Sequence, residues 1–234
     1  MASGGMIRVP EVAVVTATTG RDTLAKTIES VRQQTVPCTH YVFVDGVEWP
    51  EFVRAQDQDV KWCRLPVKTG GNGIMNGGVL AASPFLVAEP MIAWLDDDNW
   101  FEPDHIEKLL KAKGQKPYAY TLRKLVNVDG SFFDYDDCES LGPWTKFIDA
   151  NCYLIDKTIA MQTSFLWMQT TGTLNVGDRH LYQALEQNKI EFGATGEYTL
   201  NYRLNEKRDL RSFFFENNIK VRAEFPDALP WRNA

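Results

Sequence analysis

Three adjacent carboxylates stand at the end of an apolar segment, where Asp96, Asp97 and Asp98 follow the residues MIAWL. Adjacent carboxylates repel one another unless a cation or a proton intervenes. Hard oxygen ligands in a short turn suit Mg²⁺ or Mn²⁺, which often bind one or two carboxylates together with substrate phosphates. The triplet therefore suggests a divalent ion that bridges the protein to a diphosphate. Acidic residues after a strand also cap helices or face solvent, so the triplet alone leaves both interpretations open.

The segments that precede the triplet predict the first strands of an α/β sheet. Residues 12–19 form a β-rich apolar run, which is typical of a strand covered on both faces. Apolar residues at helical spacing follow over 22–34, with Asp22 as the expected N-cap, and residues 40–46 predict the next strand. This spacing indicates a βαβ unit and a parallel sheet. Ligands bind beyond the carboxyl ends of such strands, where three loops would meet: 16–21, 45–46 and 96–99.

The remaining segments predict further strands and helices, without an internal repeat or a low-complexity linker. Before the triplet we expect a short strand over 60–67, a helix that opens near Asn76 and the strand 90–95. After it we expect a helix over 102–113 and a hairpin over 118–137 with an Asp-Gly turn. The last predicted elements are a strand and short helix over 151–162, a helix over 177–188 and a strand over 197–204.

The domain organisation follows from this order of elements. We expect one α/β domain over 11–204, with an N-terminal tail over 1–10 and a C-terminal tail over 205–234. Within the domain, residues 11–100 would form a half with βαβ units of the nucleotide-binding type, and residues 101–204 a more mixed half.

Composition and charge narrow the class of protein. The formal net charge of −6 argues against a general nucleic-acid binder, which usually carries a basic field. The four cysteines are widely spaced without a CxxC pair, which argues against a zinc cluster and favours buried thiols in a reducing compartment over disulfides. No apolar run approaches the roughly 20 residues that span a bilayer, and no apolar segment of signal-peptide type opens the chain. We therefore expect a cytoplasmic protein.

The motifs occur in the order found in one enzyme family. Over about Val12–Leu204 the chain resembles family 2 glycosyltransferases, which have the glycosyltransferase A fold. The segments that carry the resemblance are "VAVVTATTGRDTLAKTIESVRQQT", "YVFVDG", "IAWLDDDNWFEPDHIEKL" with its DxD motif, "GDRHLYQAL" and "YTLNYRL". The resemblance implies an α/β fold with a Rossmann-like, mostly parallel sheet flanked by helices and a mixed acceptor-side half. It also implies transfer of a sugar from a nucleotide-diphosphate donor, with UDP favoured over GDP, to a carbohydrate or other hydroxyl acceptor.

The resemblance implies a nucleotide site at the strand ends. The residues implied for it are Thr16, Thr18, Arg21, Asp45, Asn76, Asp96 and Asp97. The threonines would lie under the nucleobase and ribose, and Asp45 would accept a hydrogen bond from the base. Asn76 matches the family's Asn, but Met75 stands where the family often has Arg, so Lys68 or Arg64 would have to supply a basic contact. Polar caps and an ordinary turn Asp are the alternative interpretations.

The resemblance also implies a divalent metal, Mn²⁺ or Mg²⁺, at the triplet. Asp98 would bind it directly, with Asp96 as a second ligand and Asp97 in support. The ion would stabilise the departing diphosphate as a Lewis acid and template. Many related enzymes place a His near the closing strand that reaches the metal, whereas this chain has Asn205 there. His180 is a further candidate ligand, and an ordinary His on a helix surface is the alternative.

The implied general base is Asp178, which would take the proton from the acceptor hydroxyl. The family often has Glu-Asp at this point, and the pair here is Gly177-Asp178, which keeps the second acid. A helix N-cap is the alternative, and one residue can fill both roles. A single base at the acceptor implies inversion of the anomeric centre, a stereochemistry that comes from the resemblance.

Three further residues are candidates for ligand contacts. Trp144 lies in the expected acceptor loop, and aromatic faces stack on sugar rings. Arg208 and Arg211 could clamp a diphosphate, or form a basic-aromatic face toward a partner or an anionic membrane surface.

Two other functions compete with a glycosyltransferase. A nucleotidyltransferase usually needs a glycine-rich loop with a basic residue after the first strand, which "TATTGRDT" matches poorly. A non-catalytic sugar- or nucleotide-binding module would be favoured by a missing base, but Asp178 is present.

Overall fold

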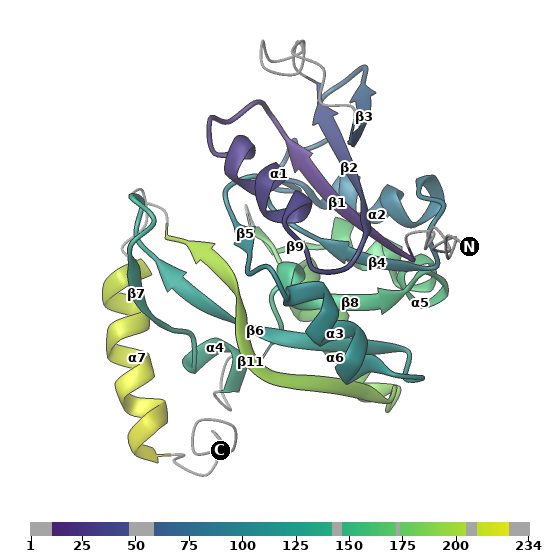
Figure 1. The fold of residues 1–234 in the computed structure, drawn as a ribbon. Helices are drawn as coiled ribbons and strands as arrows, with labels where there is room; N and C mark the ends of the chain where they lie inside the picture. The colour runs from purple at the N-terminus through teal and green to yellow at the C-terminus, as the bar shows by residue number, and fades with distance from the viewer. Residues whose placement is uncertain (1–10, 47–58, 142–146, 172–173, 205–209, 225–234) are drawn as a thin grey trace, which may run out of the picture.

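The computed structural model describes residues 11–46, 59–141, 147–171, 174–204 and 210–224. Within these residues the main sheet has nine strands in the order β3-β2-β1-β4-β8-β6-β11-β5, with β7 paired to β6 (Figure 1). The strands of this sheet are β1 (Val12–Thr18), β2 (Cys38–Asp45), β3 (Val60–Leu65), β4 (Met91–Trp94), β5 (Trp100–Phe101), β6 (Tyr118–Val126), β7 (Phe132–Tyr135), β8 (Tyr153–Asp156) and β11 (Phe192–Arg203). A small two-stranded sheet joins β9 (Thr170–Thr171) to β10 (Leu174–Asn175).

The half of the sheet that precedes the triplet is parallel. Strand β1 pairs with β2 and β4, and β2 pairs with β3, all in parallel register. The first four residues of β1, Val12–Val15, are all buried, as expected of an apolar strand covered on both faces. The predicted βαβ unit is therefore confirmed, and the ends of β1, β2 and β4 lie on one edge of the sheet.

The second half of the sheet is mixed. Strand β8 lies antiparallel between β4 and β6, whereas β11 runs parallel to β6 and antiparallel to β5. The predicted hairpin is confirmed, because β6 and β7 are antiparallel and the backbone N–H of Gly130 donates to the carbonyl of Asn127 at 2.8 Å. The predicted final strand begins earlier than expected, at Phe192.

Helices cover the apolar residues of the sheet. Their bounds are α1 (Leu24–Arg32), α2 (Gly77–Leu86), α3 (His105–Lys113), α4 (Cys138–Leu141), α5 (Lys157–Gln162), α6 (Gly177–Gln187) and α7 (Leu210–Glu224), with short 3₁₀ turns η2 (Ala150–Cys152) and η3 (Ser164–Met168). Helix α3 packs on β6 and β11, and α2 packs on η3, which in turn contacts α6. Trp94 of β4 meets Trp167 of η3 edge-on, with ring centroids 5.0 Å apart.

Helix α1 begins at Leu24, so its N-cap lies one residue after the predicted one. Thr23, and not Asp22, precedes the first helical residue, and its side chain caps no helix N–H. The Thr23 hydroxyl donates instead to the backbone carbonyl of Asp97 at 2.7 Å. A residue that could have capped the helix therefore holds the loop of the triplet.

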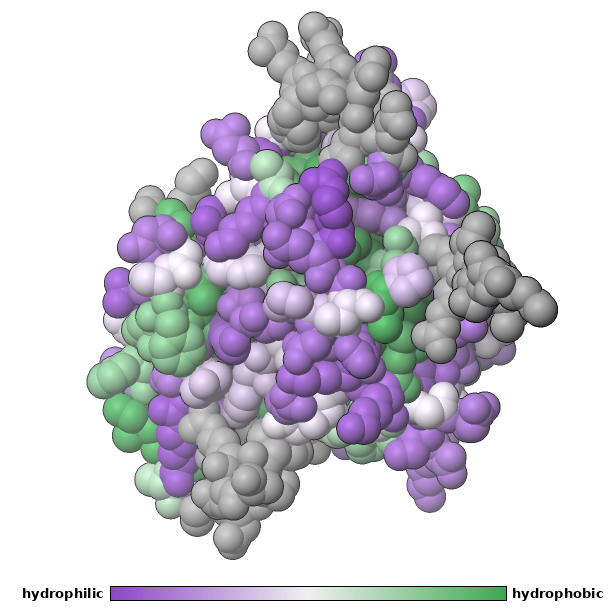
Figure 2. Space-filling model, in the orientation of Figure 1, coloured by the Kyte–Doolittle hydropathy of each residue, from purple (hydrophilic) through white to green (hydrophobic). Residues whose placement is uncertain are grey.

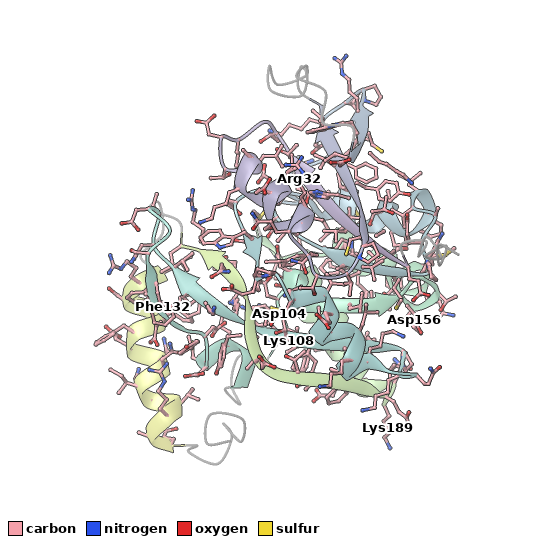
Figure 3. All side chains as sticks on the ribbon, in the orientation of Figure 1. Arg32, Asp104, Lys108, Phe132, Asp156 and Lys189 are labelled. Carbon is pink, nitrogen blue, oxygen red and sulfur yellow. The ribbon has the colours of Figure 1, made fainter. Side chains whose placement is uncertain are left out.

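Ion pairs attach α3 to its neighbours. The ammonium of Lys108 lies 2.8 Å from a carboxylate oxygen of Asp104 one turn earlier, and it also contacts Glu197 of β11. At the end of the helix, Lys113 lies 2.7 Å from Asp156, the last residue of β8. Figure 3 shows Asp104 and Lys108 close together at the start of α3, with Asp156 to their right at the end of β8.

The segment expected only as a C-terminal tail contains helix α7, which stands beside β7 in Figure 1. Phe214 and Val221 pack in a small core with Leu125, and the buried Asn218 accepts hydrogen bonds from the backbone N–H groups of Asp137 and Cys138. Figure 2 shows hydrophobic surface on this side of the molecule. Among the described residues, no helix combines the length and apolar character needed to cross a bilayer.

Candidate active site

The backbone of the triplet is held by helix α1. The Thr23 hydroxyl donates to the carbonyl of Asp97, and the Thr27 hydroxyl donates to the carbonyl of Asn99 at 2.8 Å. The backbone N–H of Leu95 continues the pairing with β1 at 2.9 Å from the Val15 carbonyl. The loop therefore has a defined shape, set by its hydrogen bonds to α1 and β1.

Asp96 lies between two asparagine amides. The Asn76 amide donates to Oδ1 of Asp96 at 2.6 Å, and the Asn151 amide donates to Oδ2 at 2.9 Å. The Asn151 carbonyl accepts the backbone N–H of Asp96 at 2.5 Å. Burial and the nearby Asp98 and Asp149 carboxylates raise the pKa of Asp96 to about 8. Asn76, the residue that precedes α2, therefore binds the triplet through its side chain, and its predicted contact with the nucleotide stays a prediction.

Asp97 and Asp98 share one arginine. The Arg21 guanidinium lies 3.3 Å from Oδ1 of Asp97 and 2.5 Å from Oδ2 of Asp98. The Thr18 hydroxyl donates to the other Asp97 oxygen at 2.7 Å. Burial raises the pKa of both carboxyls, and the charge of Arg21 opposes this rise. The structure therefore brings Thr18 and Arg21 to the triplet, as the sequence predicts.

These groups line an open cleft of about 430 Å³ at the carboxyl ends of the strands. Asp45 from β2 also lines it, with Oδ1 accepting the backbone N–H of Thr69 at 2.8 Å. Lys68 and Arg203 add positive charge. The cleft thus places carboxylates and cations around a space of ligand size.

Close backbone approach explains two glycines, Gly46 directly after β2 and Gly70 in the loop that follows β3. A Cβ at Gly70 would lie 2.3 Å from the carbonyl oxygen of Met75 and 3.5 Å from the Asp45 carboxylate. A Cβ at Gly46, whose φ is +65°, would lie 2.1 Å from the backbone nitrogen of Lys68. Both glycines let this loop close against the end of β2.

Thr16 lies apart from the cleft. Its side chain is fully buried, and Oγ1 lies 2.9 Å from Nε2 of His40 on the neighbouring strand. It is not among the residues that line the cleft, whereas Thr18, two residues later, is. The two positions lie on the same face of β1, but the strand ends at Thr18 and only that residue reaches the edge.

Asp178 occupies the first turn of α6. Its Oδ1 accepts the backbone N–H of Arg179 at 2.8 Å. Burial and the negative charge of Asp149 raise the pKa of Asp178 to about 7, while Arg179 and Arg123 oppose the rise. Asp178 is half-buried, and a carboxyl group whose pKa lies near neutrality has the property a general base needs.

The other predicted contacts are placed differently. His180 is half-buried on α6, and its backbone N–H donates to the Val176 carbonyl. Arg211 lies over the Phe133 ring, 4.8 Å from its centroid, and is not among the residues that line the cleft. Trp144, Arg208 and Asn205 lie outside the described residues.

Sequence reasoning missed three residues of the site. Asn151 is buried and links Asp96 to Asp149, which accepts both the backbone N–H and the amide of Asn151 on Oδ1. Arg203 at the end of β11 lines the cleft, and its buried Nε has no hydrogen-bond partner among the described residues. The sequence did contain signals for these residues. Asp149 and Asn151 are polar residues just before the strand Tyr153–Asp156, and Arg203 is a cation at the end of the closing strand.

The donor set of the triplet fits a divalent ion that takes only part of its coordination from the protein. Asp98 is partly exposed on the cleft and Arg21 contacts one of its oxygens, whereas both oxygens of Asp96 accept amide hydrogens. The described residues contain no group of three or more His, Cys, Asp and Glu side chains arranged to hold a metal. Magnesium-type sites often use one or two carboxylates with substrate phosphates, and of these two carboxylates that of Asp98 is the more accessible from the cleft.

Comparisons with known proteins agree with this architecture. An uncharacterised protein of Haemophilus influenzae is 34% identical over 79 residues, which cover 34% of this chain and 45% of that protein. A crystal structure of S. aureus TarS has a TM-score of 0.61 at 10% identity, covering 83% of this chain and 37% of that one. TarS 1–349 in complex with UDP-GlcNAc has a TM-score of 0.62 at 11% identity, covering 92% of this chain and 66% of that one.

The chain therefore spans less than half of the Haemophilus relative and between about one third and two thirds of these structures. At such low identity the structural likeness concerns the fold, and it confirms the predicted glycosyltransferase A fold. The model of the family described as glycosyl transferase family 2 matches residues 12–170, more than half of the chain. The resemblance drawn from the sequence is thereby confirmed, and the chain belongs to glycosyl transferase family 2.

Proposed function

We propose that this protein transfers a sugar from a nucleotide-diphosphate donor, with a UDP-sugar favoured, to an acceptor hydroxyl. The observation that carries the proposal is the cleft that gathers Asp45, the triplet and three cations at the edge of the parallel strands. TarS structures in complex with UDP and with UDP-GlcNAc share the fold, which supports UDP as the nucleotide.

The donor would bind with its base toward Asp45 and its diphosphate toward the triplet. A carboxylate accepts hydrogen bonds from a nucleobase, and Asp45 is buried at the cleft wall. Arg21, Lys68 and Arg203 would surround the diphosphate and stabilise the charge that develops on it. The buried Nε of Arg203 has no hydrogen-bond partner within the described part of the chain, and it could donate to a phosphate oxygen.

A divalent ion, Mn²⁺ or Mg²⁺, would be held by Asp98 and supported by Asp96. When bound, it would act as a Lewis acid on the departing diphosphate. Arg21 now contacts the Asp98 oxygen at 2.5 Å, and a phosphate in the cleft would offer this guanidinium a second anionic partner.

Asp178 would be the general base of an inverting transfer. Its carboxylate would take the proton of the acceptor hydroxyl while that oxygen bonds to the anomeric carbon. The bond from the anomeric carbon to the diphosphate oxygen breaks, and the diphosphate leaves with the electron pair. Because burial and Asp149 raise its pKa to about 7, Asp178 is deprotonated above neutral pH and a stronger base than an ordinary carboxylate.

The acceptor is a carbohydrate or another hydroxyl compound. An acceptor contact by Trp144 and a diphosphate contact by Arg208 stay predictions outside the described residues. A diphosphate contact by Arg211, a peripheral membrane contact and a cytoplasmic location also stay predictions.

An assay of UDP release tests the proposal against a binding module on the same fold. The protein is incubated with a panel of UDP-sugars and Mn²⁺, and released UDP is measured beside the Asp178→Asn variant. We expect release from one UDP-sugar by the unmodified protein and at least about 100-fold less by the variant. Binding of UDP without release from any sugar would instead identify a non-catalytic module.

A further inference from the structure

A single buried arginine stands among three carboxylates beside the cleft. Arg123 of β6 is 2% exposed, and its Nε donates to Asp136 at 2.7 Å. Its two terminal nitrogens donate to Asp149 and Glu139. The Tyr202 ring covers the guanidinium, with 4.3 Å from Cζ to the ring centroid. All five donors of a guanidinium point in fixed directions, so the arginine sets the relative positions of these acids.

One branch of this cluster leads to the donor side. Asp149 binds Arg123 through Oδ2, and its Oδ1 accepts from the backbone N–H and the amide of Asn151 at 2.9 and 2.8 Å. The amide of Asn151 also donates to Asp96, and its carbonyl accepts the Asp96 backbone N–H. The orientation of the first triplet carboxylate thus depends on Asp149.

A second branch leads to the acceptor side. Glu139 binds Arg123 through Oε2, and its Oε1 accepts from Arg179 at 3.3 Å. Arg179 is the residue whose backbone N–H donates to the Asp178 carboxylate. The first turn of α6, which carries the proposed base, is therefore attached to the same guanidinium.

A role in stability alone accounts poorly for this arrangement. Buried ion pairs often contribute little net stability, because desolvation offsets their attraction. Three carboxylates around one guanidinium also carry more negative than positive charge. Arg179 adds a second positive charge at Glu139, and groups with perturbed pKa values gather at functional sites, where charges orient or tune their neighbours.

We infer that Arg123 is a positioning residue, which holds the donor carboxylate Asp96 and the base Asp178 at a fixed separation through its two hydrogen-bonded branches. The inference rests on the proposed function, since it names what sets the geometry of that same site. Arg123 contacts neither substrate nor metal in this account; it acts through Asp149 and Glu139.

The charge of the cluster also acts on the base. Asp178 faces Asp149 from the loop before β8, Arg123 from β6, its neighbour Arg179 and the buried Tyr153 of β8. Loss of the Arg123 charge would raise the pKa of Asp178, because Arg123 opposes the effect of burial. Loss of the Asp149 charge would lower that pKa, because Asp149 adds to the effect.

The test compares Arg123→Gln with Arg222→Gln on the full chain. Arg222 of α7 is a matched control, because it also pairs with two carboxylates, Asp134 at 2.9 Å and Asp137 at 2.6 Å. UDP release from the UDP-sugar that the unmodified protein cleaves is measured from pH 5 to 9, together with the thermal midpoint. We expect Arg123→Gln to reduce kcat about 10- to 100-fold and to move the acid limb of the profile to higher pH.

Two further variants separate positioning from stability. Asp149→Asn should move the acid limb to lower pH, opposite to Arg123→Gln, a pattern that unfolding does not produce. It also replaces Arg123→Gln as the deciding variant should the latter fail to fold. Arg123→Lys keeps the positive charge, so the acid limb should return toward its normal pH. The value of kcat should stay low, because one ammonium cannot reach three carboxylates as the forked guanidinium does.

The outcomes are distinct from a failure of the proposed function. Absence of UDP release by the unmodified protein from every UDP-sugar would overturn the proposed function itself. Release by the unmodified protein, with Arg123→Gln and Arg222→Gln equal in kcat and acid limb, would overturn the role of Arg123. An acid limb that Asp149→Asn leaves unchanged, or moves to higher pH, would overturn it too.

Discussion

The cleft and the charge cluster beside it are built in different ways. The cleft lies where three parallel strands end, and its polar residues come one or two positions after apolar runs, as Asp45 and Asp96 do. The cluster around Arg123 joins the middle of β6 to residues ahead of α4 and β8 and to the start of α6. The cleft residues follow their strands directly in the sequence, so the local pattern indicates where they lie. The cluster residues come from separate elements and meet only in the folded protein.

The comparison separates two kinds of function. Cleft residues would contact the donor, and cluster residues would orient the groups that react. Changes in the first region should therefore act on nucleotide binding, and changes in the second on turnover. Variants of the two regions can therefore separate effects on nucleotide binding from effects on turnover.

Asp178→Asn should reduce the rate of UDP release by about 1,000-fold, within the range typical of a lost general base. UDP affinity should stay within about twofold, because Asp178 does not line the cleft. Kinetics with calorimetry on the same preparation measure both quantities. A variant that kept more than a tenth of the rate would remove Asp178 as the base.

Asn151→Ala should weaken Mn²⁺-dependent UDP binding by about 10- to 100-fold, since it frees Asp96 from one of its two amides. Asn188→Ala is the matched control, because the side chain of this asparagine donates to the Ala184 carbonyl at the end of α6, away from the triplet. Equal affinities of the two variants would show that the link from Asp96 to the cluster has no effect on binding.

The pH dependence of turnover should show the raised pKa of Asp178. Since the base must be deprotonated, kcat should rise about tenfold between pH 6 and pH 8, through a midpoint near 7. Protonation below that midpoint removes the acceptor site for the hydroxyl proton. A midpoint near 4, the ordinary value for a carboxyl group, would contradict the buried environment described for Asp178.

Thr16→Val should have the smallest effect on the site. It removes the buried hydrogen bond to His40, which should cost about 1 kcal/mol of unfolding free energy. UDP affinity should change by less than about twofold, because Thr16 does not line the cleft. Thr18→Val, two residues later, is the comparison variant and should weaken binding more, through Asp97. A large loss of UDP affinity in Thr16→Val would instead support the nucleotide contact by Thr16 that the resemblance implies.

The parts of the fold that sequence predicted are those with a strong local pattern. The βαβ unit, the Asp-Gly hairpin and the helix after Asn76 follow from apolar periodicity and turn residues. Helix α7 was missed because its buried side pairs Phe214 and Val221 with the polar Asn218, which leaves no continuous apolar stripe.

The parts of the site that sequence missed depend on long-range pairing. Asn151 reaches Asp96 only because β8 lies antiparallel beside β4, which no βαβ pattern implies. Arg123 sits inside "TLRKLV", where a charged residue suggests a solvent-exposed position, yet α7 and Tyr202 cover it. Thr16 lies two residues before the end of β1, where it contacts His40 and does not line the cleft, and the sequence pattern does not distinguish this position from the strand end.

The most direct test of the account is a calorimetric titration of UDP, then GDP, into the unmodified protein and the Asp98→Asn variant, with and without Mn²⁺. We predict that UDP binds the unmodified protein at least about tenfold more tightly with Mn²⁺, and that Asp98→Asn loses this gain while its thermal midpoint stays close to that of the unmodified protein. Equal UDP binding with and without Mn²⁺, or a full Mn²⁺ effect in Asp98→Asn, would contradict a metal-diphosphate site at the triplet.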